Sequence, residues 1–530
     1  MVDAGLRLPG RSEWPLASDA RRRNVVLSLA IVGFGALAVF LGQANSWDLR
    51  NYHLYDGWAF WTGRGDRDFA AAQLQSYFNP LLATATYLLY THTPPRVSAF
   101  VLGCVQGLNL IPLYLLGRRL LPLGVQQLHR WLPYLLALVG TLGATQLSEL
   151  GASMGDNVVS LPLLAAMALT FGASRPSLPR SAAAGLLVGL AAGIKLTAVP
   201  FAAGLLLCIP LLADGWRARC VILLAGGGAA LAAFLATDGF WLLHLYREFG
   251  DPTFPQFTHL LGGDYAPPSS LRDTRFEPRT WFEWLFYPLA WLLSPRRVSN
   301  AFFLDLRVPI ACLALPLLLF RSAIDPSEQR TRILALSVAV AYAIWLPLFA
   351  IYRYLAPLEM LAPLLVALAF RQLHAKRTQA LLGVLLVLMV IVTRPPGWGR
   401  LPAYSADFLE VRIPDVPGLQ HATVVLAEDE PLAFLALAFP ASTNFVRVSG
   451  NLLGPPSIAY GMDREATRRL AGATGPLYAL LANHRSERVT SALARQQLAI
   501  AGDCAPIRSN LLVGIHHAEL CSLERTHVLQ

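Results

Sequence analysis

The stretch Asn45-Ser-Trp-Asp-Leu-Arg-Asn-Tyr-His-Leu-Tyr-Asp-Gly-Trp-Ala-Phe-Trp-Thr-Gly63 follows directly on the first long apolar run of the chain. It places an acid, Asp48, within a residue or two of the predicted end of a membrane helix. Asn51, Tyr52 and Tyr55 lie three, four and seven positions further on, so helical spacing puts them on one face with Asp48. This face could begin a polar site.

The same stretch has a second face with a different character. Leu54, Trp58 and Trp61 lie on it, and this set suits a helix lying along lipid headgroups. Aromatic belts are common where membrane proteins meet water. The stretch alone is therefore equally consistent with an interfacial anchor that carries a solvated acid.

Composition sets the class of the protein. Of 530 residues, 55% are hydrophobic and only 14% are charged, whereas a soluble domain has about 25% charged residues. Repeated apolar runs separated by short Arg-bearing loops predict a polytopic α-helical membrane protein. The net charge of +10 could indicate nucleic acid, but the arginines cluster between apolar runs. Membrane topology explains them better, and no nucleic-acid partner is expected.

About eleven transmembrane helices are predicted. They cover residues 24–43, 98–117, 131–148, 157–173, 182–194, 197–213, 219–243, 308–320, 331–351, 354–370 and 378–393. The spans at 182–194 and 308–320 are short, so we expect them to be tilted, broken or buried among other helices. The basic stretch Arg21–Arg23 is followed by a full-length span without a small-residue cleavage site, so this span should be retained.

The basic loop residues alternate with the spans, as the positive-inside rule requires. If the N-terminal segment 1–23 is cytoplasmic, the predicted inner loops contain Arg118, Arg119, Arg130, Arg175, Arg180, Arg217, Arg219, Arg321, Arg330, Arg332, Arg371, Lys376 and Arg377. The transmembrane domain then covers 24–394, with long outer loops at 45–97 and 244–307. The C-terminal residues 395–530 lie outside the membrane.

This topology places five ionisable residues at or near the outer face: Asp48, Glu149, Asp156, Lys195 and Arg353. Each could extend to water from a span end. Because five come from separate outer segments, we favour a shared polar cavity, in which charged groups of a membrane bundle face one another.

The two outer loops differ in composition. In loop 45–97, Pro80 and the apolar run 81–90 predict a short helix on or in the membrane surface. Loop 244–307 is rich in aromatic residues, Pro and Arg. This mixture fits a headgroup-level loop that gates a lipid-accessible groove, and it also fits an ordinary interfacial loop.

After residue 392 the composition changes. The sequence Arg394-Pro-Pro-Gly-Trp-Gly399 indicates a hinge. Beyond it we predict strands at 422–427, 444–448, 477–482 and 511–515 and helices at 431–439 and 486–499, a rhythm that indicates a small extracytoplasmic α/β domain. It would cover the site or contact an acceptor. Cys504 and Cys521 could pair there, whereas His516-His517 lacks metal-ligand spacing and is expected to be solvated.

Four motifs occur in order along the membrane domain: Asp48-Leu-Arg-Asn-Tyr-His53, Met154-Gly-Asp-Asn-Val-Val-Ser160, Gly189-Leu-Ala-Ala-Gly-Ile-Lys-Leu-Thr-Ala-Val-Pro200 and Ile351-Tyr-Arg-Tyr-Leu-Ala-Pro357. Together they resemble the GT-C superfamily of membrane glycosyltransferases, which includes protein mannosyltransferases and lipid A aminoarabinose transferases. Leu49 stands where the family commonly has a second acid. The resemblance covers about residues 20–395 and identifies no characterised subfamily.

The resemblance implies transfer of a sugar from a polyprenyl-phosphate donor to a glycan, lipid or protein acceptor, at the outer face of a bacterial cytoplasmic membrane. Asp48 is the predicted general base. Arg353 and Lys195 are the predicted phosphate-binding cations, with Tyr354 beside them.

The remaining motif residues would serve the acceptor side. Asp156, Glu149, Asn51, Tyr52 and His53 are predicted to orient the acceptor or tune the base. Some family members use Mg²⁺ or Mn²⁺ and others none. Because Leu49 replaces the neighbouring acid, we expect no obligatory metal; if one binds, Asp48 and Asp156 would hold it.

Two other function classes stay open. A lipid-linked sugar transporter or flippase would share the charged cavity but should show paired inverted repeats with broken spans. The chain has one short-span pair around Lys195 and no convincing second copy. A non-catalytic scaffold gives no reason for acids at two separate outer span ends.

Overall fold

The computed structural model describes residues 14–121, 127–173, 175–261, 263–266, 271, 273–320, 326–370, 375–453, 459–484, 486–513 and 517–526. Arg272, Arg321, Arg371 and His516 lie outside the described residues, as do 1–13 of the N-terminal segment.

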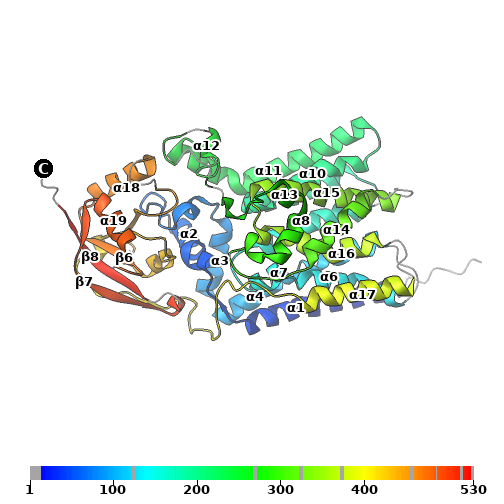
Figure 1. The fold of residues 1–530 in the computed structure, drawn as a ribbon, viewed down its shortest axis with the longest axis horizontal. Coiled ribbons are helices and arrows are strands. Elements are labelled where there is room, and N and C mark those ends of the chain that lie inside the picture. Colours follow the sequence, from blue (N-terminus) through cyan, green and yellow to red (C-terminus); the bar gives the residue numbers. More distant parts are fainter. Residues whose placement is uncertain are drawn as a thin grey trace, which may run out of the picture.

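A bundle of helices forms the larger part of the molecule (Figure 1). Its long helices are α1 (Trp14–Phe40), α4 (Pro95–Gly107), α5 (Leu110–Leu120), α6 (Gln127–Thr141), α8 (Asp156–Phe171), α9 (Leu178–Ile194), α10 (Val199–Cys208), α11 (Trp216–Phe249), α14 (Arg307–Leu319), α15 (Pro326–Leu348), α16 (Ala356–Ala369) and α17 (Lys376–Ile391). Every predicted span overlaps one of them, with α4 and α5 together covering a single span. The span predicted over 131–148 is divided, because α6 ends at Thr141 and the short helix α7 (Ala144–Glu149) follows. The polytopic helical class is confirmed.

Among the described residues, five helical segments are long and apolar enough to cross a membrane: Ala20–Phe40, Pro95–Leu120, Trp216–Phe249, Glu328–Leu348 and Tyr352–Ala369. Helices α8, α9 and α14 are apolar but shorter, as is the segment Leu196–Leu212 around α10. Short helices of this kind need neighbours to shield them.

Close packing of α9 against α11 shows how one short span is accommodated. A Cβ atom on Gly185 would lie 2.1 Å from the carbonyl oxygen of Gly226, and one on Gly189 would lie 2.1 Å from that of Ala230. Only glycine permits this approach, as in small-residue helix pairs of membrane proteins. The pairing fixes the end of α9, directly before Lys195.

Loop 45–97 is folded into helices, and the apolar run expected to be helical forms α3 (Leu81–His92). The loop also contains the π-helix η1 (Leu49–His53), α2 (Leu54–Trp61) and the 3-10 helix η2 (Gln73–Tyr77). Leu54 is only 1% exposed, and η1 and α2 pack against η9 (Ala433–Ala438) of the C-terminal domain. The interfacial-anchor interpretation is therefore wrong for Leu54, because another domain covers that face. Trp61 remains exposed.

Loop 244–307 contains α12 (Thr258–Leu261), α13 (Trp281–Leu293) and the 3-10 helices η5 (Thr274–Phe276) and η6 (Pro295–Arg297). On α13, Trp291 is buried, with its ring centroid 5.8 Å from that of Tyr352. Trp281 and Leu285, also on α13, are exposed. This two-faced helix fits a position at the membrane surface, and a gating role stays a prediction.

The C-terminal domain lies at one end of the bundle, beyond α2 and α3 (Figure 1). Its six-stranded sheet has the order β3-β7-β8-β6-β4-β5. The strands are β3 (Val411–Arg412), β4 (Thr423–Leu426), β5 (Asn444–Arg447), β6 (Leu477–Leu481), β7 (Leu498–Ser509) and β8 (Ala518–Arg525). β4 pairs in parallel with β5 and β6, and the remaining pairs are antiparallel. With α18 (Gly461–Ala471) and α19 (Glu487–Arg495), this is the expected α/β domain.

Some predictions inside this domain are wrong. The strand expected over 511–515 is instead the 3-10 helix η10 (Asn510–Leu512), with residues 514–516 outside the described chain, and the last strand follows at Ala518. The helix expected to reach residue 499 ends at Arg495, because β7 already begins at Leu498. Sequence patterns also missed α18.

A segment of loop 45–97 joins the domain to the bundle. Phe69 forms a parallel bridge with Val446, beside the edge strand β5. The buried Arg64 bonds to Asp68 at 2.7 Å, and Asp68 accepts from the backbone N–H of Phe445 at 3.0 Å. Backbone pairing fixes the domain over the loop that begins at Asp48.

Candidate functional site

Four charged residues from separate segments meet at one end of the bundle. Asp48 precedes η1, Asp156 begins α8, Lys195 follows α9, and Arg353 lies in the 3-10 helix η7 (Tyr352–Leu355). Arg353 Nη1 lies 2.6 Å from Asp48 Oδ2, and Arg353 Nε lies 4.0 Å from Asp156 Oδ2. Lys195 Nζ lies 2.6 Å from Asp156 Oδ1. The structure thus brings together residues that the sequence placed at one membrane face.

Breaks between helices aim these side chains at one another. Gly155 has φ +83° immediately before α8, a conformation that glycine accepts readily. Lys195 ends α9 in an extended conformation, and its ammonium also donates to the Met154 carbonyl at 2.8 Å. The loop before α8 and the end of α9 are thereby joined through one lysine.

The acids at this site are paired with cations, which decides their protonation. Burial opposes ionisation of Asp48, but the charge of Arg353 and the hydrogen bond that it donates outweigh this effect, so the pKa of Asp48 is lowered from its usual value. Burial lowers the pKa of His53 to about 3. At neutral pH Asp48 is therefore ionised, and His53 is neutral with its Nδ1 2.7 Å from Ser153 Oγ.

Two further carboxylate oxygens lie close to the cluster without direct partners. Glu149 is fully buried at the end of α7 (Ala144–Glu149), and its Oε2 accepts from the Asn157 backbone N–H at 3.3 Å. Glu149 Oε1 and Asp156 Oδ2 have no hydrogen-bond partner among the described residues. Neighbouring buried carboxylates of this kind share a proton or face a bound group.

Aromatic rings surround the two cations. Lys195 Nζ lies 5.7 Å from the ring centre of Tyr354, and Arg353 Cζ lies 5.2 Å from it. The Arg353 guanidinium also lies 6.0 Å from the ring centre of Trp398. Sequence analysis missed Trp398, because its Pro-Gly-rich surroundings indicated only a hinge.

The other predicted site residues divide into two groups. Tyr52 lies beside the cluster, with its ring centroid 4.2 Å from that of His53. The Asn51 amide instead donates to the Ala72 carbonyl at 3.2 Å and to Gln75 at 3.3 Å. Tyr55 donates to Asp68, away from the cluster. Residues 49–53 form a π-helical turn, which has a different side-chain spacing from an α-helix. Asn51 and Tyr55 therefore do not share one face with Asp48, as α-helical spacing had predicted.

A small hollow lies beside Asp156, and its volume of about 10 Å³ is enough for about one water molecule. Its lining combines the polar residues Asp156, Ser160 and Thr197 with the apolar residues Val159, Leu163 and Phe201.

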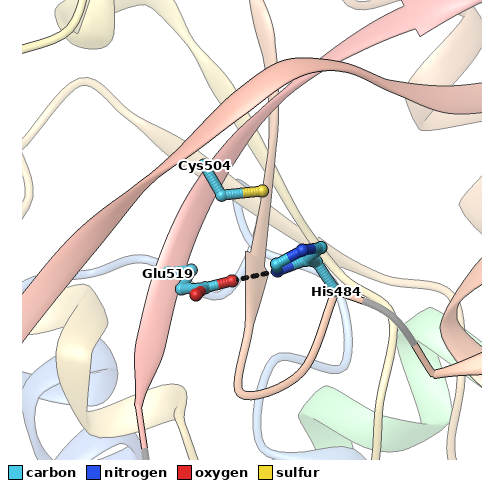
Figure 2. Close-up of side chains that lie close together, drawn as sticks. All are labelled: His484, Cys504 and Glu519. Atoms are coloured by element: carbon cyan, nitrogen blue, oxygen red, sulfur yellow. Dashed lines mark hydrogen bonds and ion pairs between the residues drawn. The ribbon is translucent and has the colours of Figure 1, made fainter.

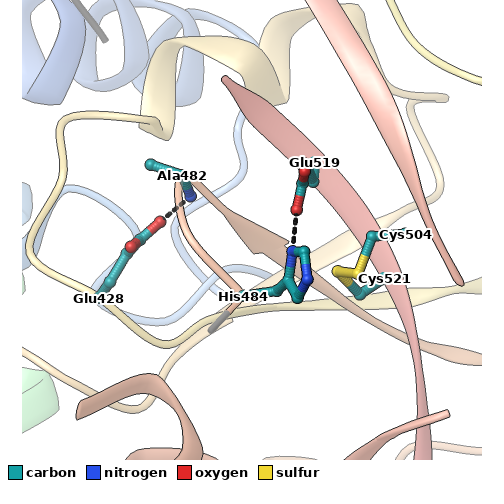
Figure 3. Close-up of a disulfide and its surroundings, with 6 residues drawn as sticks. All are labelled: Glu428, Ala482, His484, Cys504, Glu519 and Cys521. Carbon is teal, nitrogen blue, oxygen red and sulfur yellow. Dashed lines mark hydrogen bonds and ion pairs between the residues drawn. A yellow bond between two sulfur atoms is a disulfide. The ribbon is translucent and has the colours of Figure 1, made fainter. Parts of the chain in front are cut away.

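The described residues include one set of three potential metal ligands gathered at a point, and it lies elsewhere. His484, Cys504 and Glu519 meet on the C-terminal sheet (Figure 2). Cys504 is bonded to Cys521 in a disulfide, so it offers no thiolate (Figure 3). Two remaining ligands are too few for a structural zinc site. Asp48 and Asp156, the predicted metal ligands, each contact a cationic side chain, and their role as ligands stays a prediction.

Comparisons with known proteins give a similarity in structure but none in sequence. No family model matches the chain, and no curated protein matches it. The structure is similar to the crystal structure of ArnT from Cupriavidus metallidurans bound to undecaprenyl phosphate. The match covers 95% of this chain and 98% of that chain, with 11% identity and a TM-score of 0.44. The roles of individual residues rest on the contacts within the cluster itself.

Proposed function

We propose that the protein is a membrane glycosyltransferase that moves a sugar from a polyprenyl-phosphate donor to a glycan, lipid or protein acceptor at the outer face of the bacterial cytoplasmic membrane. The observation that carries the proposal is the cluster of Asp48, Asp156, Lys195 and Arg353. It combines an ionised carboxylate with two cations, and the side chains of Asp48, Lys195 and Arg353 remain 15 to 19% exposed.

The proposed reaction assigns one role to each charge. Asp48 accepts the proton of the acceptor hydroxyl while that oxygen forms a bond to the anomeric carbon of the sugar. The bond between this carbon and the phosphate oxygen breaks, and the polyprenyl phosphate leaves with the bonding electrons. Arg353 and Lys195 stabilise the negative charge on the leaving phosphate, and Arg353 can bind two oxygens at once.

The Asp48–Arg353 contact couples donor binding to base strength. In the structure the Arg353 guanidinium holds Asp48 ionised but makes it a weak base. A donor phosphate that binds Arg353 competes with Asp48 for the same N–H groups. Asp48 then loses its partner and becomes a stronger base at the time the acceptor needs it.

We propose no obligatory metal for this reaction, since Arg353 and Lys195 already supply positive charge at the acids where Mg²⁺ or Mn²⁺ would bind. Chelation with EDTA tests this point: activity should persist within about twofold. A loss that added Mg²⁺ or Mn²⁺ restores would assign Asp48 and Asp156 as ligands instead.

The orientation belongs to the same proposal. The Cys504–Cys521 disulfide is typical of an oxidising, extracytoplasmic compartment. We therefore place the C-terminal domain and the cluster outside the cytoplasm and the N-terminus inside.

Purified protein in proteoliposomes, given radiolabelled polyprenyl-phosphate sugars and a panel of acceptors, tests the function. Label should leave the lipid for an acceptor with wild type and not with Asp48→Asn. Label that crosses the membrane while still attached to lipid would favour the transporter alternative. Donor that is neither consumed nor moved would contradict both functions.

A further inference from the structure

The linker between the last span and the C-terminal domain passes through the candidate site. Its strand β2 (Arg400–Leu401) pairs antiparallel with β1 (Gln43–Ala44), directly before the Asp48 segment. The Asn45 backbone N–H donates to the Gly399 carbonyl at 3.1 Å. A hinge would leave these backbone groups to solvent, so this linker is a fixed part of the structure.

Arg400 connects the end of the short helix α7 to the end of α1. Its Nη2 donates to the carbonyls of Ser148 at 3.0 Å and Leu150 at 2.6 Å, the residues on either side of Glu149. Its Nη1 donates to the Gly42 carbonyl at 3.3 Å, just beyond α1. The turn that carries Glu149 is therefore held to the segment that carries Asp48.

Trp398 connects the same turn to Arg353. Its Nε1 donates to Ser148 Oγ at 3.2 Å, and its ring lies 6.0 Å from the Arg353 guanidinium. The Arg353 side chain is 18% exposed, so this contact involves a cation that is already partly removed from water. Cation–π contacts gain strength under such conditions.

Gly399 lies between Trp398 and Arg400, and its backbone conformation lets both side chains make these contacts. Its φ is +102°, and a Cβ atom there would lie 2.5 Å from the Asn45 carbonyl oxygen. Gly397, two residues earlier, has open space around it and no positive φ. The pair offers a matched comparison within one linker.

We propose that Trp398 and Arg400 are positioning residues of the site. Trp398 holds the Arg353 guanidinium toward the donor phosphate, and Arg400 holds the Glu149 turn against the Asp48 segment. This inference rests on the proposed transferase function for its kinetic consequences, but the placement of Arg353 is independent of any reaction. The tether of the C-terminal domain is then part of the active centre.

The first experiment measures Arg353 directly and needs no substrate. Purified full-length protein is treated with phenylglyoxal, and the modification rate of Arg353 is followed by peptide mass spectrometry. Trp398→Ala should raise this rate by about tenfold, since an aromatic cover worth up to about this factor is removed. Trp398→Phe keeps a ring and should react like wild type, as should Trp61→Ala, which removes an exposed tryptophan of the same outer region.

The second experiment uses the transferase assay. Trp398→Ala should raise the donor KM by about tenfold and change kcat little, because the donor phosphate loses a fixed cation. Gly399→Ala should lower kcat/KM by about tenfold, whereas Gly397→Ala should stay within about twofold of wild type. The melting temperature of each variant separates these effects from unfolding.

The outcomes separate this inference from the proposed function. Faster modification of Arg353 in Trp398→Ala, with no transfer by wild type, would keep the positioning role and remove the glycosyltransferase assignment. Modification rates within twofold of wild type in Trp398→Ala would overturn the positioning role, whatever the assay shows. Equal kinetic effects of the Gly397 and Gly399 substitutions would show that the linker acts as a hinge after all.

Discussion

Two groups of buried charges in the membrane domain contain the same residue types and differ in what surrounds them. One is the candidate site, in which Arg353 and Lys195 face Asp48 and Asp156. The other contains Arg307 and Asp305, which bond at 2.6 Å and are both 0% exposed in their side chains. Glu359 lies beside this second pair and is also fully buried.

The second group is saturated by bonds within the protein. Arg307 donates to the carbonyls of Val139 and Leu142 and to Thr393 Oγ1 as well as to Asp305. Asp305 accepts from the backbone N–H of Ala144, where α7 begins. This arrangement fixes one end of α7 and leaves no access to a ligand.

The candidate site is unsaturated by comparison. The side chains of Asp48, Lys195 and Arg353 are 15 to 19% exposed, and oxygens of Glu149 and Asp156 have no hydrogen-bond partner among the described residues. Helix α7 joins the two groups, with its start bound to Asp305 and its end carrying Glu149. Unsatisfied polar groups and partial exposure, rather than buried charge alone, therefore distinguish a candidate site from a structural ion pair.

Neutralising one acid of the candidate site should have the largest effect, and it tests whether this group acts in transfer rather than in stability. Asp48→Asn should reduce transfer by about a hundred- to ten-thousand-fold, because the proposed base is lost, and should leave the melting temperature near that of wild type. Steady-state transfer rates and thermal unfolding measure both. Asp66→Asn, at an exposed acid in the same loop, is the control and should transfer like wild type. Unchanged transfer by Asp48→Asn would mean that another residue is the base.

The matching substitution in the second group should act on stability instead. Arg307→Met leaves the buried Asp305 carboxylate without its cation, and breaking a buried pair costs about 3–5 kcal/mol. Thermal unfolding in detergent should show a large decrease in melting temperature. In the fraction that remains folded, the donor KM should be unchanged. A changed KM with normal stability would place Arg307 in the site and remove the distinction between the two groups.

The sequence predicted those parts of the site that depend on local topology, and it missed those that depend on contacts between distant segments. Asp48, Asp156, Lys195 and Arg353 could be grouped from the sequence, because span ends and basic loops predict the same face for all four. Trp398 could not, because its position depends on β1–β2 pairing across the whole length of the membrane domain. The strand error near residue 511 has a different cause: a short apolar run fits a 3-10 turn as well as a strand.

A smaller effect is expected when the donor-side cation of the site is removed. Arg353→Ala should raise the donor KM by about ten- to a hundredfold, since charge-assisted bonds to phosphate contribute about 1.5–3 kcal/mol. It should also raise the pKa of Asp48, because the opposing burial effect then acts with less compensation. The acid limb of kcat/KM would move to higher pH. Arg394→Ala, at an exposed arginine after α17, should change neither quantity.

The smallest predicted effect concerns Glu428, a partly buried carboxylate for which the structure shows no ion pair among the described residues. Burial raises the pKa of Glu428 in the C-terminal domain to about 7 from its usual 4.5, and its oxygen accepts from the Ala482 backbone N–H (Figure 3). Between these pH values the unfolded chain binds fewer protons than the folded one, so stability falls as pH rises from about 4.5 to about 7.

Glu428→Gln removes this titration, so it should flatten the fall in melting temperature between pH 5 and pH 8. The gain at pH 8 should be about 1 kcal/mol, because Glu428 is only partly buried and solvent reduces the effect. Glu524→Gln, at an exposed acid of the same sheet, should keep the wild-type pH dependence. If Glu428→Gln kept it as well, Glu428 would ionise at its ordinary pKa. The opposite pKa shifts of Asp48 and Glu428 could then not be explained by the ion pair that Asp48 forms and that Glu428 lacks among the described residues.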